Sequence, residues 1–374
     1  MSDQRNPYQG LQPEFFWRTA VAEADWSLPK AVYTKKFPIT RAERIATAGS
    51  CFAQHIGRRL KAHGFTVLDT EPPPSGLDAT QHAKFGYSIY SARYGNIYTV
   101  RQLLQLVKEA YGKWEPGEVV WSNEDGRFFD AFRSSVEPDG LGSPAEVIAH
   151  RRFHLTKVRQ LLNDMTLLIF TLGLTEAWID RATGTTFPMV PGAIAGTYDS
   201  ERYAFKNFTF AEIYEDLGEL LSLLTAQRDG TSPLKIMLTV SPVPLTATAS
   251  GRHVLQATVY SKSVLRAVAG QFAAEHSNID YFSSFEIISN PWSRQDYYLE
   301  NRRSVSNQGV DTVMSVFFSH HIPTALDNGA APQNAATHSA PRAGSIGEPS
   351  KAANAAEDTI CDEELLAAFG ERAA

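Results

Sequence analysis

The sequence predicts an α/β fold with a doubly wound parallel sheet, a three-layer sandwich with helices on both faces. Three apolar runs have the length and composition of strands buried on both faces: Arg44–Gly49, Thr166–Leu172 and Lys235–Ser241. Helical patterns stand between these runs, so strand, helix and strand alternate along the chain. Such an order requires right-handed crossovers, which place helices on both faces of a parallel sheet.

The other elements follow in order around these strands. Residues 1–40 contain four prolines and several aromatic residues, and we interpret them as an arm covering a single main domain at 41–321. Gly64–Leu68 has the pattern of a short strand. The remaining patterns predict a helix at residues 100–107 and an insertion at 114–143 that forms a pocket wall or a surface excursion. They also predict amphipathic helices at 144–162 and 209–224 and a last strand at 279–282.

Composition and charge restrict the class of protein. The 374 residues carry a net charge of -6 and no run of Lys and Arg, so we expect no nucleic-acid partner. The amino terminus lacks a secretory signal and no stretch is apolar enough to span a bilayer, so we expect a cytoplasmic protein without a membrane partner. Only Cys51 and Cys361 are cysteines, which excludes a disulfide framework. His150 and His154 have helical spacing but no third ligand, so we expect neither metal nor cofactor.

The stretch Arg44–Leu60 is the predicted site of chemistry, because a strand leads directly into a helix. Ser50 is placed to cap the first helical turn, and Cys51 follows it. Both side chains therefore lie at the carboxyl end of a strand, where ligands bind in open α/β sheets. The helix dipole there favours a thiolate or an anionic oxygen. A plain turn with a capping serine and a packed cysteine fits the same pattern.

Five short blocks stand out in order along the chain: Gly49–Ala53, Tyr94–Thr99, Thr171–Trp178, Leu238–Pro244 and Tyr260–Arg266. These blocks resemble the GSCFA family, a bacterial group related to the SGNH or GDSL-like hydrolases. The first block is the signature Gly-Ser-Cys-Phe-Ala, and together the blocks extend over roughly residues 40–320. The resemblance implies an SGNH-hydrolase-like sandwich and chemistry on acyl esters.

The resemblance also implies roles for residues outside the first helix. A glycine of the second SGNH block donates a backbone N–H to the oxyanion, which points to Gly95 beside Asn96. Where SGNH enzymes carry an oxyanion-binding asparagine, this chain has Thr175 and Glu176. The Thr175 hydroxyl can still donate, whereas Glu176 is suited to orient a histidine or hold a hydroxyl-rich substrate. A turn glycine and a carboxylate at a helix start are the structural alternatives.

The chain departs from the SGNH pattern at two places. Asn301 and Ser304 stand where the aspartate and histidine of the last block would be, so the usual base is missing. In the first block Cys51 stands at the nucleophile position and Ser50 replaces the aspartate. A thiol at a helix start needs less help from a base than a hydroxyl does. The block also resembles the Gly-Asn-Cys opening of some capsule-polysaccharide acetyltransferases, which supports acyl transfer.

Several histidines are candidates for the missing base. His253 follows the third predicted strand, and its neutral imidazole suits general-base work near neutral pH. His55 lies four residues after Cys51 and therefore near it on the same helix. His320 and His321 are the remaining candidates.

The last residues differ in composition from the main domain. Residues 322–358 are rich in small and polar residues and predict a disordered linker. Residues 359–374 predict a short acidic helix that docks on its own domain or on a protein partner, or a frayed tail.

Taken together, these patterns predict an ester hydrolase or O-acyltransferase. Cys51 or Ser50 attacks an acyl carbonyl, and backbone donors with Gly95 and Thr175 stabilise the oxyanion. The partner is a small-molecule or carbohydrate acyl ester; the resemblance alone suggests the carbohydrate. The alternatives are a non-catalytic binding module that kept the crevice, and an adaptor whose C-terminal helix recruits a partner.

Overall fold

A five-stranded parallel sheet forms the centre of the protein, as predicted. The computed structural model describes residues 6–228, 234–293, 295–322 and 362–371. The sheet consists of β1 (Arg44–Gly49), β2 (Thr66–Val67), β5 (Leu167–Leu172), β9 (Lys235–Val240) and β10 (Ile279–Tyr281). The strand order is β10-β9-β5-β1-β2, and every neighbouring pair is parallel.

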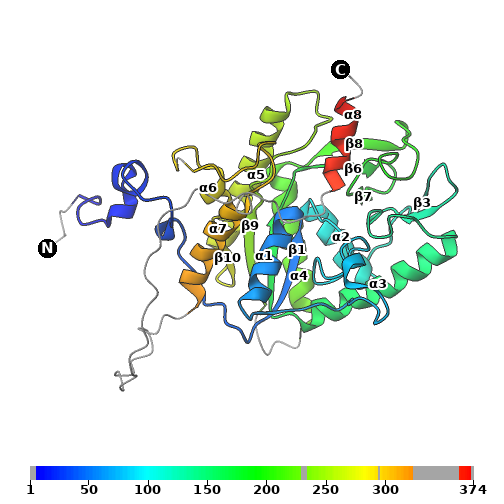
Figure 1. Ribbon diagram of the computed structural model, residues 1–374, viewed down its shortest axis with the longest axis horizontal. Helices are drawn as coiled ribbons and strands as arrows, with labels where there is room; N and C mark the ends of the chain where they lie inside the picture. The colour runs from blue at the N-terminus through cyan, green and yellow to red at the C-terminus, as the bar shows by residue number, and fades with distance from the viewer. Residues whose placement is uncertain (1–5, 229–233, 294, 323–361, 372–374) are drawn as a thin grey trace.

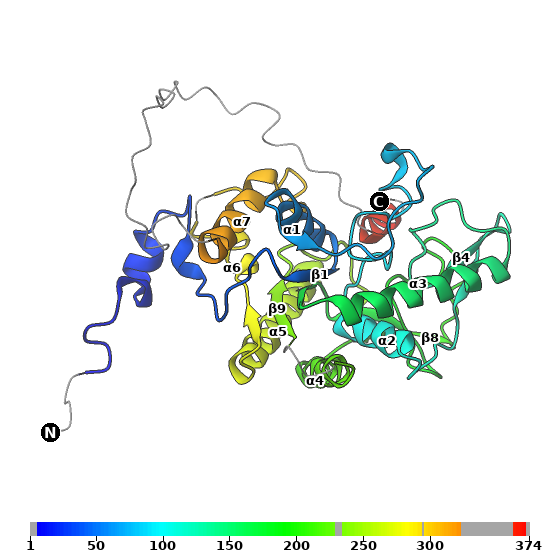
Figure 2. The same ribbon diagram turned by 90° about the horizontal axis from the view of Figure 1, so that it is seen from below.

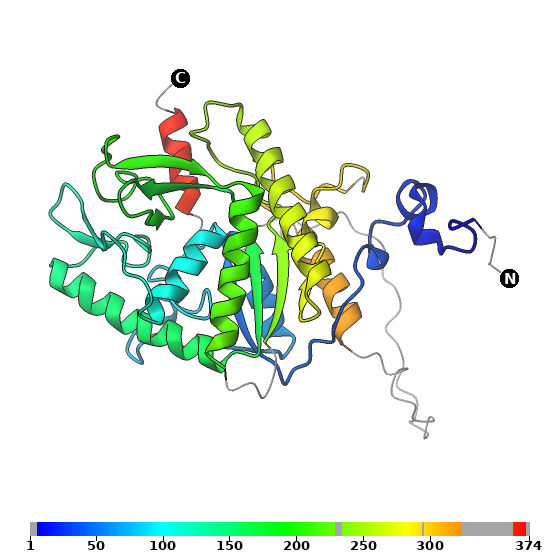
Figure 3. The same ribbon diagram turned by 180° about the vertical axis from the view of Figure 1, so that it is seen from behind.

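Helices cover both faces of this sheet, which confirms the three-layer α/β fold (Figures 1, 2 and 3). Ile45 and Ile169 face one hydrophobic core. The next residue in each strand, Ala46 or Phe170, faces the other core, because side chains alternate along a strand. The first core is covered by α1 (Cys51–Ala62), α6 (Ser284–Ile288) and α7 (Asn307–His321). The second is covered by α2 (Val100–Ala110), α3 (Pro144–Asp164), α4 (Phe210–Ala226) and α5 (Val254–Glu275). None of the described helices is long and apolar enough to cross a membrane.

The predicted strand Gly64–Leu68 is shorter than expected, since only Thr66 and Val67 pair with β1. The N–H groups of Gly64 and Phe65 instead donate to the last turn of α1, at Lys61 and Leu60. These two residues therefore end the helix before the strand begins.

Two antiparallel insertions interrupt the alternation of strand and helix. The hairpin of β3 (Val120–Ser122) and β4 (Phe128–Asp130) lies in the predicted insertion, and β7 (Thr186–Phe187), β6 (Glu176–Asp180) and β8 (Tyr203–Asn207) form a three-stranded sheet. They pack on each other through a small aromatic core around Trp121 and Phe187. Glu176 therefore begins a strand, and the expectation that it stands at a helix start is wrong. Cross-strand pairing of Trp178 with Phe187 and Phe205 favours the sheet.

The chain ends differ in how they pack. Short turns begin the chain: η1 (Pro13–Phe15), η2 (Arg18–Ala22) and η3 (Lys30–Val32), with η4 (Ala79–Gln81) before α2. Trp26 and Tyr33 of the predicted arm are buried, whereas Phe15 and Trp17 are exposed. At the other end, η6 (Asp362–Leu366) and α8 (Ala367–Glu371) lie beside the antiparallel sheet (Figure 1). The predicted linker, apart from Ile322, lies outside the described residues.

Candidate functional site

The predicted crevice lies at the switch point of the sheet. From β1 the chain passes outward to β2, and it later returns to the other side of β1 as β5. The carboxyl ends of β1 and β5 are in register, with Gly49 opposite Thr171. In doubly wound sheets ligands bind where the winding direction changes. Ser50, Cys51 and Gly173 therefore occupy the place where this fold class binds its ligands.

Gly49 allows α1 to begin directly at this point. Its φ of +143° lies in the region that favours glycine, and an added Cβ would lie 2.7 Å from the backbone oxygen of Thr171. Ser50 stands at the N-cap position, but its side chain makes no capping hydrogen bond, so that prediction is wrong. Its extended backbone leaves Oγ against the next loop, where a Cβ on Gly173 would lie 3.4 Å away. Cys51, the first helical residue, is buried and only 6% exposed.

Asn96 faces this helix start through a buried hydrogen-bond network. The Tyr90 hydroxyl donates to Asn96 Oδ1 at 2.6 Å, and Gln54 Nε2 donates to the Tyr90 oxygen at 3.1 Å. Burial is the main cause that raises the pKa of Tyr90, and the nearby Asp362 carboxylate adds to this rise, so the phenol keeps its proton and donates. Because Asn96 Oδ1 accepts from Tyr90, its Nδ2 is the group left to donate elsewhere. Nδ2 donates to Asp362 at 3.0 Å.

A buried group of charges fixes the loop that carries Gly95 and Asn96. The N–H of Arg93 donates to Glu71 Oε2 at 2.9 Å, and the Arg133 guanidinium donates to the Arg93 carbonyl at 3.0 Å. The Tyr94 hydroxyl donates to the carbonyl of Thr47 on β1. The φ of +70° at Gly95 gives that loop its turn. These contacts tie the loop to the sheet and hold the Asn96 amide in place.

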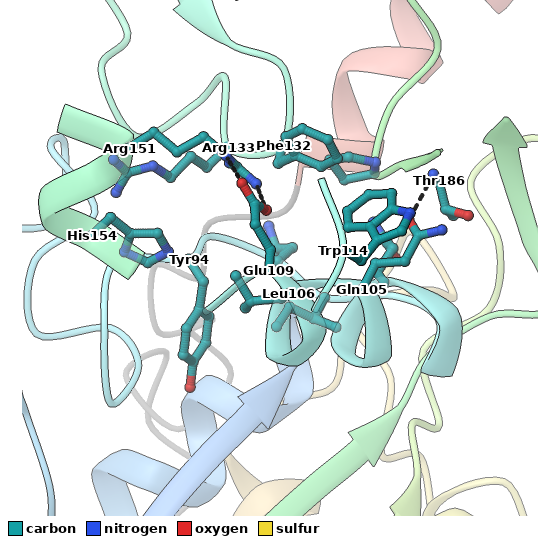
Figure 4. A pocket seen from close by; sticks show the side chains of 14 residues that line it. Tyr94, Gln105, Leu106, Glu109, Trp114, Phe132, Arg133, Arg151, His154 and Thr186 are labelled. Carbon is teal, nitrogen blue, oxygen red and sulfur yellow. Dashed lines mark hydrogen bonds and ion pairs between the residues drawn. The ribbon is translucent and has the colours of Figure 1, made fainter. Parts of the chain in front are cut away.

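Arg151 on α3 lies at the centre of these charges. Its guanidinium donates to Glu109 at 2.8 Å and to Asp130 at 2.9 Å, and Figure 4 shows it directed at Glu109, which projects from α2. Burial opposes ionisation of Asp130, but Arg151 and Arg133 outweigh it and lower its pKa to about 2. The cavity between these side chains has a volume of about 30 Å³, enough for one or two waters but not for a substrate. We therefore assign this cluster a positioning role.

His154, also in this cluster, gives the protein a specific pH dependence. Burial and then Arg133 lower its pKa to about 4, although Glu71 accepts a 2.7 Å hydrogen bond from its Nδ1 and opposes that change. Arg151 adds to the lowering, and the ring of Tyr94 packs at its edge. An unfolded histidine takes up its proton near pH 6.5, so the unfolded state binds more protons between pH 6.5 and 4. Stability contributed by neutral His154 is thus complete above pH 6.5 and is lost as the pH falls towards 4.

We expect His154→Gln to remove part of the stability loss between pH 7 and pH 5. The His154 component of that loss is on the order of 1–2 kcal/mol. Urea unfolding at the two pH values measures it in both proteins. His150→Gln, one turn earlier on α3 and exposed, is the matched control and should keep the wild-type difference. An unchanged pH difference in His154→Gln would contradict the assignment of a neutral buried imidazole.

The other predicted site residues lie in different surroundings, and only some of them line a pocket. Thr175 is fully buried, and its N–H donates to Ser261 Oγ at 3.0 Å. Glu176 accepts a 2.9 Å hydrogen bond from Thr248, and burial raises its pKa. His253 is exposed and caps α5 through its Nδ1, which accepts from Leu255, so it does not line the pocket beside Glu176. That pocket has a volume of about 180 Å³ and a mainly apolar lining, including Leu174, Trp178, Met189, Phe205, Leu245 and Leu366.

The histidines at the end of α7 lie at the wrong edge of the sheet for a base. His321 Nδ1 accepts from Ile39, which precedes β1, whereas Cys51 follows β1. His320 contacts the carbonyl of Lys30. The expectation that either replaces the missing base is therefore wrong. His55 is buried on α1, one turn after Cys51, with its ring 6.1 Å from that of Phe52.

Asn301 and Ser304, which replace the last SGNH block, bind each other. Asn301 Nδ2 donates to Ser304 Oγ at 2.9 Å, and its Oδ1 accepts the N–H groups of Arg303 and Ser304. Arg302 has a φ of +54°, so the segment forms a tight turn. The turn presents Arg303, and its guanidinium contacts Glu363 Oε2 at 3.0 Å.

Sequence reasoning missed several residues of the site. Lys262 is buried on α5, and its Nζ donates to the Gly173 carbonyl at 2.7 Å, which fixes the loop after β5. A lysine inside the block Tyr260–Arg266 was the available signal, because a lysine on the buried face of a helix needs a polar partner. Tyr90, Gln54 and Arg303 gave no comparable signal. The partners of Gln54 and Arg303 lie 36 and 60 positions away, and no motif links Tyr90 to Asn96.

Comparisons with known proteins agree with the five blocks. No curated protein and no solved structure matches the chain. The model of the GSCFA family matches residues 44–317, which include all five strands of the central sheet, the crevice after β1 and the turn at Arg303. The match extends over well more than half of the chain, and the protein therefore belongs to the GSCFA family.

Proposed function

We propose that this protein transfers acyl groups from an ester, as a hydrolase or an O-acyltransferase, with Cys51 as its nucleophile. The observation that carries the proposal is the Asn96 amide. Tyr90 and Gln54 hold it so that Nδ2 donates to a carboxyl oxygen near the start of α1. An acyl oxyanion needs such a fixed donor, together with the backbone N–H groups of a helix start.

The proposed reaction proceeds in two steps. Cys51 Sγ transfers its proton to His55 and forms a bond with the acyl carbon, and the carbonyl oxygen accepts from Asn96 Nδ2. The ester C–O bond then breaks, and the leaving alcohol takes the proton from His55. Water, or the hydroxyl of an acceptor, attacks the thioester with His55 again as base and restores the thiol. Ser50 is the alternative nucleophile, since it precedes Cys51 at the same turn and its Oγ lies against Gly173.

The pocket beside Glu176 combines apolar walls with two polar side chains, which supports an acyl ester as the substrate. Its volume of about 180 Å³ and apolar walls suit a short acyl chain. Glu176 and Thr248, which bind each other at its rim, offer groups that recognise hydroxyls. The family's relation to SGNH hydrolases supports an acylated carbohydrate as the substrate class.

We expect Cys51→Ala to lower the turnover of p-nitrophenyl acetate, butyrate or hexanoate by about 100-fold or more, because the nucleophile is lost. Asn96→Ala should lower kcat by about 10²–10³ through loss of one oxyanion donor. The measurement is ester hydrolysis by the full chain, with Cys361→Ser as the matched cysteine control that keeps activity. Full turnover in Cys51→Ala would exclude Cys51, and Ser50→Ala would then be the decisive variant.

A non-catalytic binding module is the second candidate. The observation in its favour is the turn in which Asn301 and Ser304 bind each other, so that neither offers a base to the crevice. This candidate predicts that iodoacetamide does not label Cys51 and that no ester is turned over. The enzyme predicts labelling of Cys51 with a midpoint below the ordinary thiol pKa of about 8.5.

A further inference from the structure

We propose that Asn96 and Arg303 form a carboxylate-binding subsite beside the candidate nucleophile, and that the chain's own acidic turn Asp362–Glu364 fills this subsite. The ligand class is a compound that carries a carboxylate near its reacting group. The proposal rests on the proposed function only where it calls that ligand a substrate.

The first contact is the one with Asp362. This carboxylate is buried, and its Oδ2 accepts from Asn96 Nδ2 at 3.0 Å. Burial raises the pKa of Asp362, while hydrogen bonds from Asn96 and Ser135 favour the ionised form. Asn96 cannot turn its oxygen towards Asp362 without losing the hydrogen bond from Tyr90. The hydrogen bond from Tyr90 thus orients Asn96 so that its Nδ2 donates to a carboxyl oxygen at this point.

The second contact is made by Arg303. Its side chain is 12% exposed and lies 3.0 Å from Glu363 and 3.2 Å from Glu364. The Asn301 turn fixes the backbone of Arg303, which orders a guanidinium whose planar fork of donors suits carboxylates. The N–H of Glu363 donates to the Tyr98 hydroxyl at 3.3 Å. With Asp362, three carboxylates and one backbone group therefore hold the turn.

Two acidic residues of the segment are buried more fully than two of its apolar residues. Asp362 and Glu363 are buried, whereas Leu365 and Phe369 are 47% and 53% exposed. A helix that docks through the hydrophobic effect buries its apolar side chains and leaves its acids in water. Here Asp362 and Glu363 are buried while Leu365 and Phe369 are exposed, so carboxylate recognition helps to seat the segment, beside the contact of Leu366 with the apolar pocket.

The segment also borders the proposed acyl pocket. Glu363 and Leu366 form part of its wall, together with Glu176 and Trp178. A ligand whose carboxylate replaces the acidic turn would enter beside this pocket. The contacts of Arg303 that seat the chain's own turn would then seat the carboxylate of the substrate, and its reacting carbonyl would take the place of Asp362 at Asn96 Nδ2.

Binding of a labelled peptide tests the subsite without using the reactivity of Cys51. The probe is fluorescein-labelled peptide 359–374 with Cys361→Ser, followed by fluorescence anisotropy with the full chain. We expect it to bind the double variant Asp362→Lys, Glu363→Lys at least about tenfold more tightly than wild type, whose own turn competes. Adding Arg303→Gln to the double variant should weaken binding by about tenfold or more.

Three controls decide the outcome. Glu300→Lys, an exposed charge reversal near the same turn, should leave peptide binding as weak as in wild type. The isosteric double variant Asp362→Asn, Glu363→Gln replaces the lysine variant if thermal unfolding shows that the latter is misfolded. Glutarate should displace the peptide more effectively than chloride at equal ionic strength. Equal peptide binding by wild type and variant, no effect of Arg303→Gln, or equal displacement by chloride would each overturn the subsite. An inert Cys51 would overturn only the proposed function.

Discussion

Gly49→Ala should destabilise the protein by about 3 kcal/mol or more, the largest effect we expect from adding a single methyl group. The new Cβ would lie 2.7 Å from the backbone oxygen of Thr171, 2.8 Å from its Cβ and 3.0 Å from Ala53 Cβ. Two of these three atoms belong to β5, in the middle of the sheet, so neither can move without breaking strand pairing. The φ of +143° adds backbone strain for any residue with a side chain.

Chemical unfolding of wild type and variant measures this effect, and Gly218→Ala is its control. Gly218 lies within α4, and nothing lies within 4 Å of an added Cβ there. The same substitution should raise stability by about 0.5–1 kcal/mol at that position, because alanine is the better helix former. A loss below about 1 kcal/mol in Gly49→Ala would show that β1 and β5 can separate at the crevice. The first glycine of the family signature would then need another explanation.

The strands and the first helix could be predicted because their signals are local. The apolar runs at β1, β5 and β9 and the glycine that ends β1 mark the sheet without knowledge of any distant contact. The switch point follows from the order of these elements, which is why the sequence could place Ser50 and Cys51 beside it. The same local reasoning failed for Glu176, since its strand is defined by pairing with residues 203–207.

The rest of the site depends on contacts between distant residues. Asn96 gains its orientation from Tyr90 and Gln54, and its carboxylate partner is 266 positions further along the chain. No periodicity or motif connects such residues. His253 was predicted to face the crevice because it follows a strand. That position does not fix the direction of the side chain, which caps α5 instead. Sequence patterns therefore placed Ser50 and Cys51 at the switch point but did not identify the groups around them.

Arg151→Met should cost about 3–5 kcal/mol of unfolding free energy, because it leaves two buried carboxylates without their main cation. Arg151 donates to both Glu109 and Asp130, and its guanidinium lies 4.1 Å from the ring centroid of Phe132. Methionine keeps much of the side-chain length, so loss of charge is the dominant change. Arg152→Met, at the next and exposed position of α3, should stay within about 0.5 kcal/mol of wild type.

The pH dependence of this loss separates lost charge pairing from lost packing. In wild type the pKa of Asp130 is lowered from 3.8 to about 2, so its stabilising contribution is complete above pH 3.8 and disappears as the pH falls towards 2. The variant lacks much of that contribution at neutral pH. The stability difference between wild type and Arg151→Met should therefore be largest near pH 7 and narrow below pH 4. A difference that stays constant in acid would mean that Arg151 acts through packing on Phe132. Among the buried charges, Glu71 and Arg133 would then be the groups that position the loop of Asn96.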